Sequence, residues 1–164
     1  MKSELFYLSY AQEKLFCLMQ EEWADKIPTM PKLRYYVKFK SDITTASYLK
    51  ANITRTKRSL LAQLRLGILP LAIETDRYYR IPLEKRFCKL CNECLIEDEI
   101  HFLCTCTFFS DEHENLFDEI ILQLPDFRNF SLNEKFIQLM VYDDKIVSKY
   151  VENAWFKRKS KLIL

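Results

Sequence analysis

The amino-acid sequence predicts a mainly α-helical fold with one small, cysteine-rich element near the middle of the chain. The 164 residues include a single glycine, Gly67, which argues against a hairpin-rich β fold. Apolar residues recur at steps of three, four and seven between prolines and capping residues, as in amphipathic helices. Five of the six cysteines lie between Cys88 and Cys106. A chain of this length with 49% hydrophobic residues can bury one core.

The first predicted helix runs from residue 3 to about residue 24. Leu8, Leu15 and Trp23 follow helical spacing along it, and Pro28 lies just beyond its end. Cys17 belongs to this apolar helix, so we expect it to pack in the core. The next segment, residues 33–39, alternates apolar and basic residues and fits a strand and a helix equally well.

Two further helices are predicted before the cysteines, a short one over residues 45–51 and a longer one over residues 54–66. Leu60, Leu61, Leu64 and Ile68 share one face of the longer helix, and Gly67 and then Pro70 end it. On this helix the neighbouring face carries three basic side chains, Arg55, Arg58 and Arg65.

Three more helices are predicted after the cysteines. Ser110 can cap a helix that reaches about residue 124, and Ser131-x-x-Glu134 matches a capping box that opens the next one. Asp143 can cap the last helix, from whose end we expect the basic residues 157–161 to fray. We divide the chain into an N-terminal helical region (1–54), a middle region with the cysteines (55–124) and C-terminal helices with a basic tail (125–164).

The cysteine-rich stretch has the spacing of a metal site. It reads Cys-x2-Cys-x9-His-x4-Cys and offers four soft ligands, Cys88, Cys91, His101 and Cys106. Two cysteines separated by two residues can reach one metal ion from a single tight turn. The other two ligands then come from a short element that folds back over that turn. We therefore predict a structural zinc ion held in a short hairpin or knuckle.

Other interpretations of the same residues compete with zinc. Cys94 and Cys104 add further registers, so spacing alone leaves open which four of the six groups bind. Disulfides are rare in reducing compartments, and a redox Cys-x-x-Cys normally accompanies a βαβ pattern that this sequence lacks. Plain core packing of the cysteines is the remaining alternative. We favour zinc.

Two sets of polar residues near the cluster are expected to play no part in chemistry. The acidic run from Glu97 to Glu99 lies between the two ligand pairs, where we expect it to stay solvated, with no apolar pocket to raise a carboxyl pKa. His113 has no cysteine or histidine at ligand spacing, so we expect it to be exposed or to cap a helix.

The sequence also indicates a non-enzymatic chain. A single glycine excludes Gly-rich phosphate loops and dinucleotide fingerprints, and two histidines supply no convincing catalytic set. The tetrapeptide from Val141 to Asp144 loosely resembles the aromatic-x-Asp-Asp turn of polymerases, but it joins two predicted helices and fits a helix cap better. We expect no small-molecule substrate.

Neither a membrane span nor a signal peptide is expected. No apolar run reaches the roughly 18 residues that a membrane-spanning helix needs. The start, Met1 to Glu4, is not followed by the apolar stretch of a signal peptide. We expect a soluble protein of the nucleus or cytoplasm.

Charge is distributed in blocks along the sequence. Residues 50–91 hold ten Lys or Arg against three acids, residues 92–119 hold nine acids and no Lys or Arg, and residues 145–164 hold six Lys or Arg against one Glu. Such blocks indicate separate basic and acidic faces, or simply solvated helix faces. Tyr78 and Tyr79 stand among the basic residues, where they could stack on unpaired bases or pack against the core. The candidate phosphate-binding residues are Arg55, Arg58, Arg65, Arg77, Arg80, Lys85 and Arg86.

About a third of the chain resembles a known family. The residues are Arg58-Ser-Leu-Leu-Ala-Gln-Leu-Arg65, Glu74-Thr-x-Arg77-Tyr78, Cys88-x-x-Cys91 and Ile96-Glu-Asp-Glu-x-His101-Phe-Leu with Cys106. They are similar to the zinc-binding segment downstream of the reverse transcriptase in non-LTR (LINE-like) retrotransposon polyproteins. Thr107 stands where that family usually has proline, Cys94 and Cys104 are extra, and no polymerase or endonuclease motif is present.

The resemblance implies the same four zinc ligands and a nucleic-acid-associated role as a fragment or relic of a larger mobile-element protein. From it and from the basic residues we expect a zinc-dependent module that binds RNA or DNA. The alternative is a zinc-stabilised protein-interaction module, in which the acidic helix from Ser110 docks a protein partner.

Overall fold

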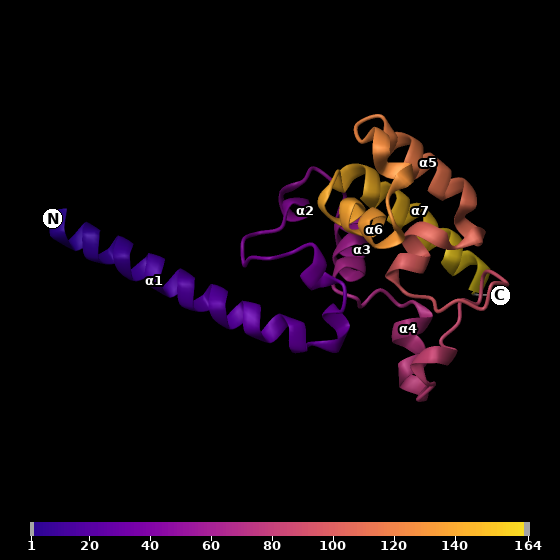
Figure 1. The fold of residues 1–164 in the computed structure, drawn as a ribbon, viewed down its shortest axis with the longest axis horizontal. Helices are drawn as coiled ribbons and strands as arrows, with labels where there is room; N and C mark the ends of the chain where they lie inside the picture. The colour runs from indigo at the N-terminus through magenta and orange to yellow at the C-terminus, as the bar shows by residue number, and fades with distance from the viewer. Residues whose placement is uncertain (1, 163–164) are drawn as a thin grey trace.

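The computed structural model describes residues 2–162, and helices dominate this range (Figure 1). Its one β pairing in the described residues is an isolated antiparallel bridge between Phe87 and Ile96. The predicted mainly α fold is therefore confirmed. The α-helices are α1 (Lys2–Lys26), α2 (Ser47–Lys50), α3 (Arg55–Arg65), α4 (Ala72–Thr75), α5 (Ser110–Ile121), α6 (Leu132–Val141) and α7 (Asp144–Leu162).

Short helical turns connect these elements. One of them, η6 (His101–Thr105), is a π-helix. The others are 3-10 turns: η1 (Ile27–Thr29), η2 (Pro31–Leu33), η3 (Tyr36–Lys38), η4 (Asp76–Tyr79), η5 (Leu83–Lys85), η7 (Thr107–Phe109) and η8 (Pro125–Asn129).

The last helix, α7, is the centre of the core. It packs against α3, α5 and α6, and it buries Val147, Tyr150, Val151 and Ala154. The cluster of buried apolar side chains also takes in Tyr48 from α2, so all three predicted regions of the chain contribute to one core. Within the described range, no helix combines the length and the apolar character needed to cross a bilayer.

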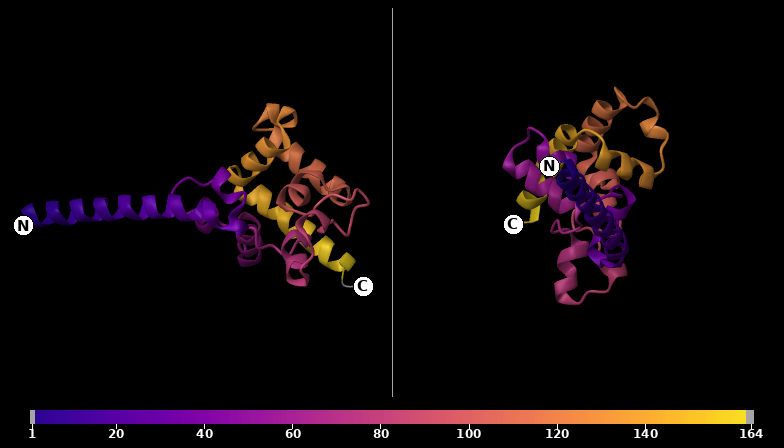
Figure 2. Two further views of the ribbon diagram at one scale, coloured as in Figure 1. Left: turned by 60° about the horizontal axis from the view of Figure 1, so that its bottom comes forward. Right: turned by 90° about the vertical axis from the view of Figure 1, so that its left-hand side faces the viewer.

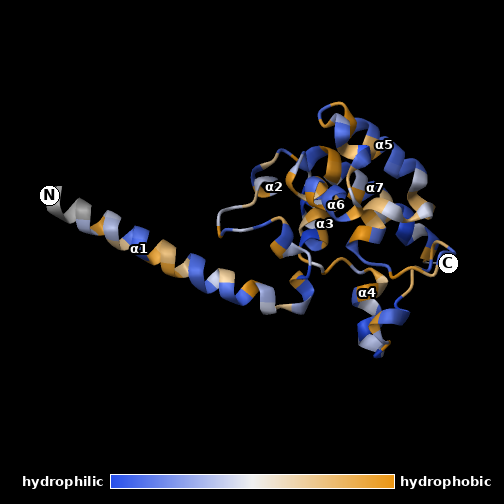
Figure 3. Cartoon of the chain, in the orientation of Figure 1, coloured by the Kyte–Doolittle hydropathy of each residue, from blue (hydrophilic) through white to orange (hydrophobic). Residues whose placement is uncertain are grey.

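Helix α1 projects from this body (Figures 1 and 2). Near its C-terminal end the Trp23 and Tyr36 rings meet edge to face, and the side-chain amide of Gln20 bonds the backbone of Ser41 and Ile43. Farther along, apolar side chains face solvent, among polar ones (Figure 3). The helix itself is as predicted, but Cys17 is exposed and does not pack in the core.

Residues 33–39 form neither a continuous helix nor a strand. They pass through the 3-10 turns η2 and η3, and their aromatic side chains pack against the body. The ring centroid of Tyr35 lies 5.2 Å from that of Phe136, and the centroid of Phe39 lies 6.2 Å from it. The apolar periodicity of residues 33–39 fitted a helix and a strand equally well. The packing of their aromatic rings on α6 thus determines their conformation.

The predicted helix boundaries depend on local capping, and most are confirmed. Thr54 accepts a hydrogen bond from the backbone N–H of Lys57. Ser131 and Glu134 form both bonds of a capping box. Asp143 accepts from the backbone N–H of Lys145 and so starts α7. The tetrapeptide from Val141 therefore joins two helices, as expected.

The position where α3 ends requires a glycine, Gly67, for two physical reasons. Its φ of 65° lies in the left-handed region, where a side chain costs about 1–2 kcal/mol. A Cβ at this position would also collide with the backbone carbonyl oxygen of Lys32. The glycine thus lets the segment after α1 lie directly on the end of α3. Ile68, by contrast, is exposed and does not join the buried face of that helix.

Two predictions about polar residues in this region were wrong. His113 is buried and lies between the Phe117 and Tyr150 rings, with centroid separations of 5.8 and 5.4 Å. Its Nε2 lies 3.2 Å from the carbonyl oxygen of Phe102 and 2.8 Å from the Tyr150 hydroxyl. The basic C-terminal residues do not fray either, because α7 stays helical to Leu162.

We predict that His113 makes stability depend on pH. Burial lowers the pKa of its imidazole below the ordinary 6.5, so the folded state favours the neutral ring. The stabilisation is complete above pH 6.5 and is lost as the pH falls through the lowered pKa, at up to about 1.4 kcal/mol per pH unit.

The measurement is the free energy of unfolding by urea at pH 7.5 and pH 5.5, for the wild type and for His113→Gln. Any metal site is the same in both chains, so its own pH dependence cancels. The advantage of the wild type should shrink at pH 5.5. A difference independent of pH would contradict the assignment.

Candidate metal centre

A rudimentary hairpin supplies the first two cysteines. The backbone N–H of Cys88 donates to the carbonyl of Leu95 at 2.8 Å, and the N–H of Glu97 donates to the carbonyl of Arg86 at 3.0 Å. Between Cys88 and Leu95 the chain turns through Cys91. The predicted short hairpin or knuckle is therefore present.

The π-helix η6 supplies the other two side chains. A π-helical turn bonds residues five apart, and here the N–H of Cys106 donates to the carbonyl of His101 at 2.9 Å. The carboxylate of Asp98 accepts from the backbone N–H of His101 at 2.8 Å and so caps the turn. In an α-helix, residues five apart point in different directions. The π turn brings His101 and Cys106 to the same side.

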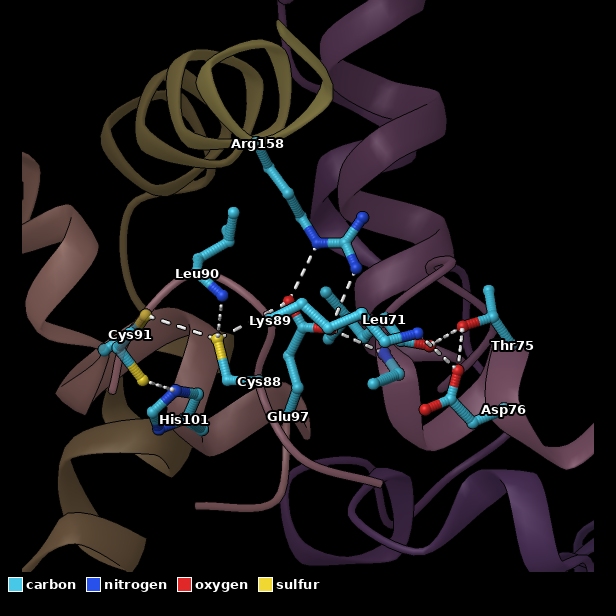
Figure 4. A network of polar contacts seen from close by, with 12 residues as sticks. Leu71, Thr75, Asp76, Cys88, Lys89, Leu90, Cys91, Glu97, His101 and Arg158 are labelled. Carbon is cyan, nitrogen blue, oxygen red and sulfur yellow. Dashed lines mark hydrogen bonds and ion pairs between the residues drawn. The ribbon is translucent and has the colours of Figure 1, made fainter. Parts of the chain in front are cut away.

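All four predicted ligand side chains converge. Their ligand atoms lie within 4.8 Å of one another, and each side chain is buried or nearly so. The sulfur atoms of Cys88 and Cys106 are 3.8 Å apart, and Cys91 Sγ lies 3.4 Å from His101 Nε2. A tetrahedral ion with metal–sulfur bonds near 2.3 Å spaces its sulfur ligands about 3.8 Å apart. Figure 4 shows Cys88, Cys91 and His101 pointing toward one another.

The remaining cysteines lie outside this group. Cys94 is exposed at the hairpin turn, and Cys104 is buried, where burial raises the pKa of its thiol to about 12. All six cysteines are free thiols. The 3.8 Å between Cys88 and Cys106 is far above the roughly 2.05 Å of a disulfide. The arrangement could hold a metal ion.

The environment favours a thiolate at Cys88. The Cys106 thiol and the backbone N–H of Leu90 both donate to Cys88 Sγ, which lowers the pKa of Cys88 to about 3. The pKa of Cys106 is raised in turn, because its proton makes that bond and because it is buried. A metal ion would displace this shared proton and bind both sulfurs as thiolates.

His101 is oriented by a second contact. Its Nδ1 lies 3.1 Å from the hydroxyl oxygen of Thr105, one turn along η6, while Nε2 faces the cysteines. Metal-binding histidines usually have such a partner on the nitrogen that does not bind the metal, because it fixes both the tautomer and the ring orientation. Thr105 is therefore a positioning residue.

The expectation that the acidic run stays solvated was wrong, because Glu97 is 1% exposed. Arg158 of α7 donates to it from Nε and from Nη2, each at 2.8 Å (Figure 4). The backbone N–H of Ala72 donates to the same carboxylate at 2.7 Å. The Cys88 sulfur lies 3.9 Å away. Glu97 thus joins the cysteine hairpin to α7 and to the start of α4.

The next two acids of the run also have specific partners. Glu99 is 1% exposed and forms an ion pair with Arg34. Asp98 accepts from the Tyr35 hydroxyl at 2.6 Å. Both partners belong to the segment that follows α1, so the acidic run also holds that segment. Sequence spacing gave no signal for these contacts, which join residues 61 to 65 apart.

Three of the seven predicted nucleic-acid contacts are buried or half-buried. Arg65 is buried, with its guanidinium about 5 Å from the Phe39 and Tyr48 ring centroids. Arg58 donates to backbone carbonyls before α3, and Arg86 donates to the carbonyls of residues 73 and 81. Burial removes Arg65 from the candidate phosphate contacts, and backbone carbonyls hold the guanidinium groups of Arg58 and Arg86. The other four are exposed: Arg55, Arg77, Arg80 and Lys85.

Comparison with known proteins gave no relatives. No family model, no curated protein and no solved structure matches the chain.

We predict that Glu97→Gln destabilises the protein strongly. The neutral amide leaves the buried guanidinium of Arg158 without its counter-charge, at a cost of about 3–5 kcal/mol. The free energy of unfolding by urea measures it, and Glu93→Gln is the control because Glu93 is an exposed acid of the same hairpin. Equal losses in the two variants would show that the ion pair does not hold the hairpin to α7.

Proposed function

We propose that the four-residue cluster binds a structural zinc ion and that the chain is a non-catalytic module for single-stranded nucleic acid. Three cysteines and one histidine that converge in a buried cluster are typical of structural zinc. Four protein ligands fill the coordination sphere, so a zinc ion here would have no open position for substrate. Its role would be to hold η6 and the hairpin together.

The observation that carries the nucleic-acid proposal is an exposed aromatic and basic tip. Tyr78 and Tyr79 are 70% and 79% exposed, although tyrosines at such positions more often pack partly against a core. The guanidinium of Arg77 lies 5.2 Å from the Tyr78 ring centroid, and Arg80 and Lys85 are exposed nearby in sequence. Aromatic rings that stack on bases, beside cations that neutralise phosphates, are the usual means of binding single strands.

The tip depends on the cluster for its position. It belongs to the lobe of α4 and the following turns that extends from the helical body (Figure 1). Arg86 closes the lobe by donating to the carbonyl of Ile73 at 2.8 Å, and the N–H of Ile73 donates to the carbonyl of Glu97 at 3.1 Å. Lys89, next to Cys88, forms an ion pair with Asp76 at 2.9 Å. A metal ion would therefore hold the tip in place through the hairpin.

Two further considerations support this choice. The resemblance to the zinc-binding segment of retrotransposon reverse transcriptases suggests RNA or DNA as the partner. The acidic helix α5, the alternative docking surface, already has intramolecular partners for four of its five acidic side chains. Lys157 pairs with Glu112, Lys149 with Glu119, and Arg128 with both Glu114 and Asp118.

We predict one zinc ion per chain, lost in Cys106→Ser and kept in Cys104→Ser. Both cysteines are buried, but only Cys106 belongs to the cluster. Native mass spectrometry measures the metal, and a thermal melt with and without a strong chelator measures its effect. Chelation should collapse the melt, because structural zinc contributes about 10–16 kcal/mol of apparent binding energy. Protein that carries no metal after expression in zinc-rich medium would refute the site.

For nucleic acid, we predict that Tyr79→Ala weakens binding of a fluorescent 20-nucleotide oligo(dT) or oligo(U) about 5- to 150-fold, because one stacked base contributes about 1–3 kcal/mol. Fluorescence anisotropy measures the affinity, which should fall steeply with salt. Tyr10→Ala is the matched control, since Tyr10 is 61% exposed on α1. Failure to bind either oligonucleotide, or equal losses in the two variants, would refute the proposal.

A further inference from the structure

A groove lies where the segment after α1 meets the end of α3. One wall comes from residues 29–33 and the other from Leu66 and Ile68, with Arg77 at the rim. Its volume is about 550 Å³. The carbonyl of Lys32 rests against Gly67, so the two walls meet backbone to backbone and neither side chain nor loop separates them.

The groove is lined by aliphatic side chains that remain open to solvent. Met30 is 44% exposed and Ile68 39%, and Pro31, Leu33 and Leu66 complete the apolar surface. Burying such side chains is worth roughly 25 cal/mol per Å² of apolar area. The lining contains no aromatic ring on which a base could stack. Its chemistry therefore differs from that of the tip at Tyr78 and Tyr79.

The rim of the groove carries unbalanced positive charge. Lys32 Nζ and Arg77 Nη2 lie 2.9 and 2.8 Å from the same carboxylate oxygen, Oε1 of Glu74. The Glu74 side chain is only 8% exposed, whereas those of Lys32 and Arg77 are 39% and 41% exposed. Two cations share one buried anion, so one positive charge is left facing solvent beside the apolar surface.

We propose that this groove docks a short segment of a protein partner in which a large apolar side chain is followed or preceded by Asp or Glu. The apolar side chain fills the space between Met30 and Ile68. The neighbouring carboxylate pairs with Lys32 and Arg77 and supplies the second anion that the rim lacks. Apolar anchors in grooves with charged rims are a common mode of peptide recognition. The groove and the tip share Arg77, and they differ in their other contacts, which are aliphatic in the groove and aromatic at the tip.

The test starts from a displayed library of randomised 12-residue peptides, selected against the metal-loaded chain. Enriched peptides should combine a large apolar residue with an adjacent acid. Their affinity, measured by fluorescence anisotropy, should fall at least tenfold in Ile68→Asp and stay unchanged in Leu122→Asp, whose leucine is 84% exposed on the surface. Met30→Asp, at the opposite wall, repeats the test if Ile68→Asp fails to fold by circular dichroism.

Tyr79→Ala separates this inference from the proposed function. It should leave peptide affinity unchanged while it weakens oligonucleotide binding. Three results would overturn the inference: no enrichment of peptides, enrichment of basic in place of acidic peptides, or affinity that survives both groove variants. Loss of oligonucleotide binding in Ile68→Asp, without any peptide binding, would show that the groove serves nucleic acid and would equally overturn it.

Discussion

Most of this structure depends on the contacts that the buried carboxylate of Glu97 makes. It accepts two hydrogen bonds from Arg158 of α7 and one from the backbone of Ala72, and it lies 3.9 Å from the sulfur of Cys88. A single side chain thereby joins the last helix, the start of the α4 lobe and the cysteine hairpin. Buried ion pairs rarely add net stability, but breaking one is costly. The Glu97–Arg158 pair therefore specifies how the cysteine hairpin packs against α7 and the start of α4.

What could be predicted from the sequence was local. The capping residues Ser131 and Asp143, the left-handed Gly67 and the Cys-x2-Cys turn depend on neighbours within a few residues, and the structure has each of them. The four candidate ligands converge as their spacing indicated, although spacing alone left Cys94 and Cys104 open as alternatives. Whether they hold zinc stays a prediction.

What could not be predicted depends on partners that are distant in the sequence. Charge alone made Arg65 look like a phosphate contact, but the rings of Phe39 and Tyr48 enclose it. His113 appeared to lack a partner because Tyr150 is 37 residues away. Tyr78 and Tyr79 are exposed, although tyrosines at such positions more often pack partly against a core. The type of a residue limits the chemistry that its side chain can perform. Only packing determines whether that side chain is exposed to solvent.

The π-helical turn from His101 has a consequence for how the chain tolerates changes in length. The five-residue step to Cys106 already spans one wide π-helical turn, so inserting one residue there would rotate the cysteine by roughly 100° around the axis and away from His101. The length of the exposed loop between Cys91 and Ile96 is not fixed by a helical turn. Insertions should therefore be tolerated between Cys91 and Ile96 but should disrupt the cluster between His101 and Cys106. The histidine–cysteine spacing is thus the more rigid signature in any search for related chains.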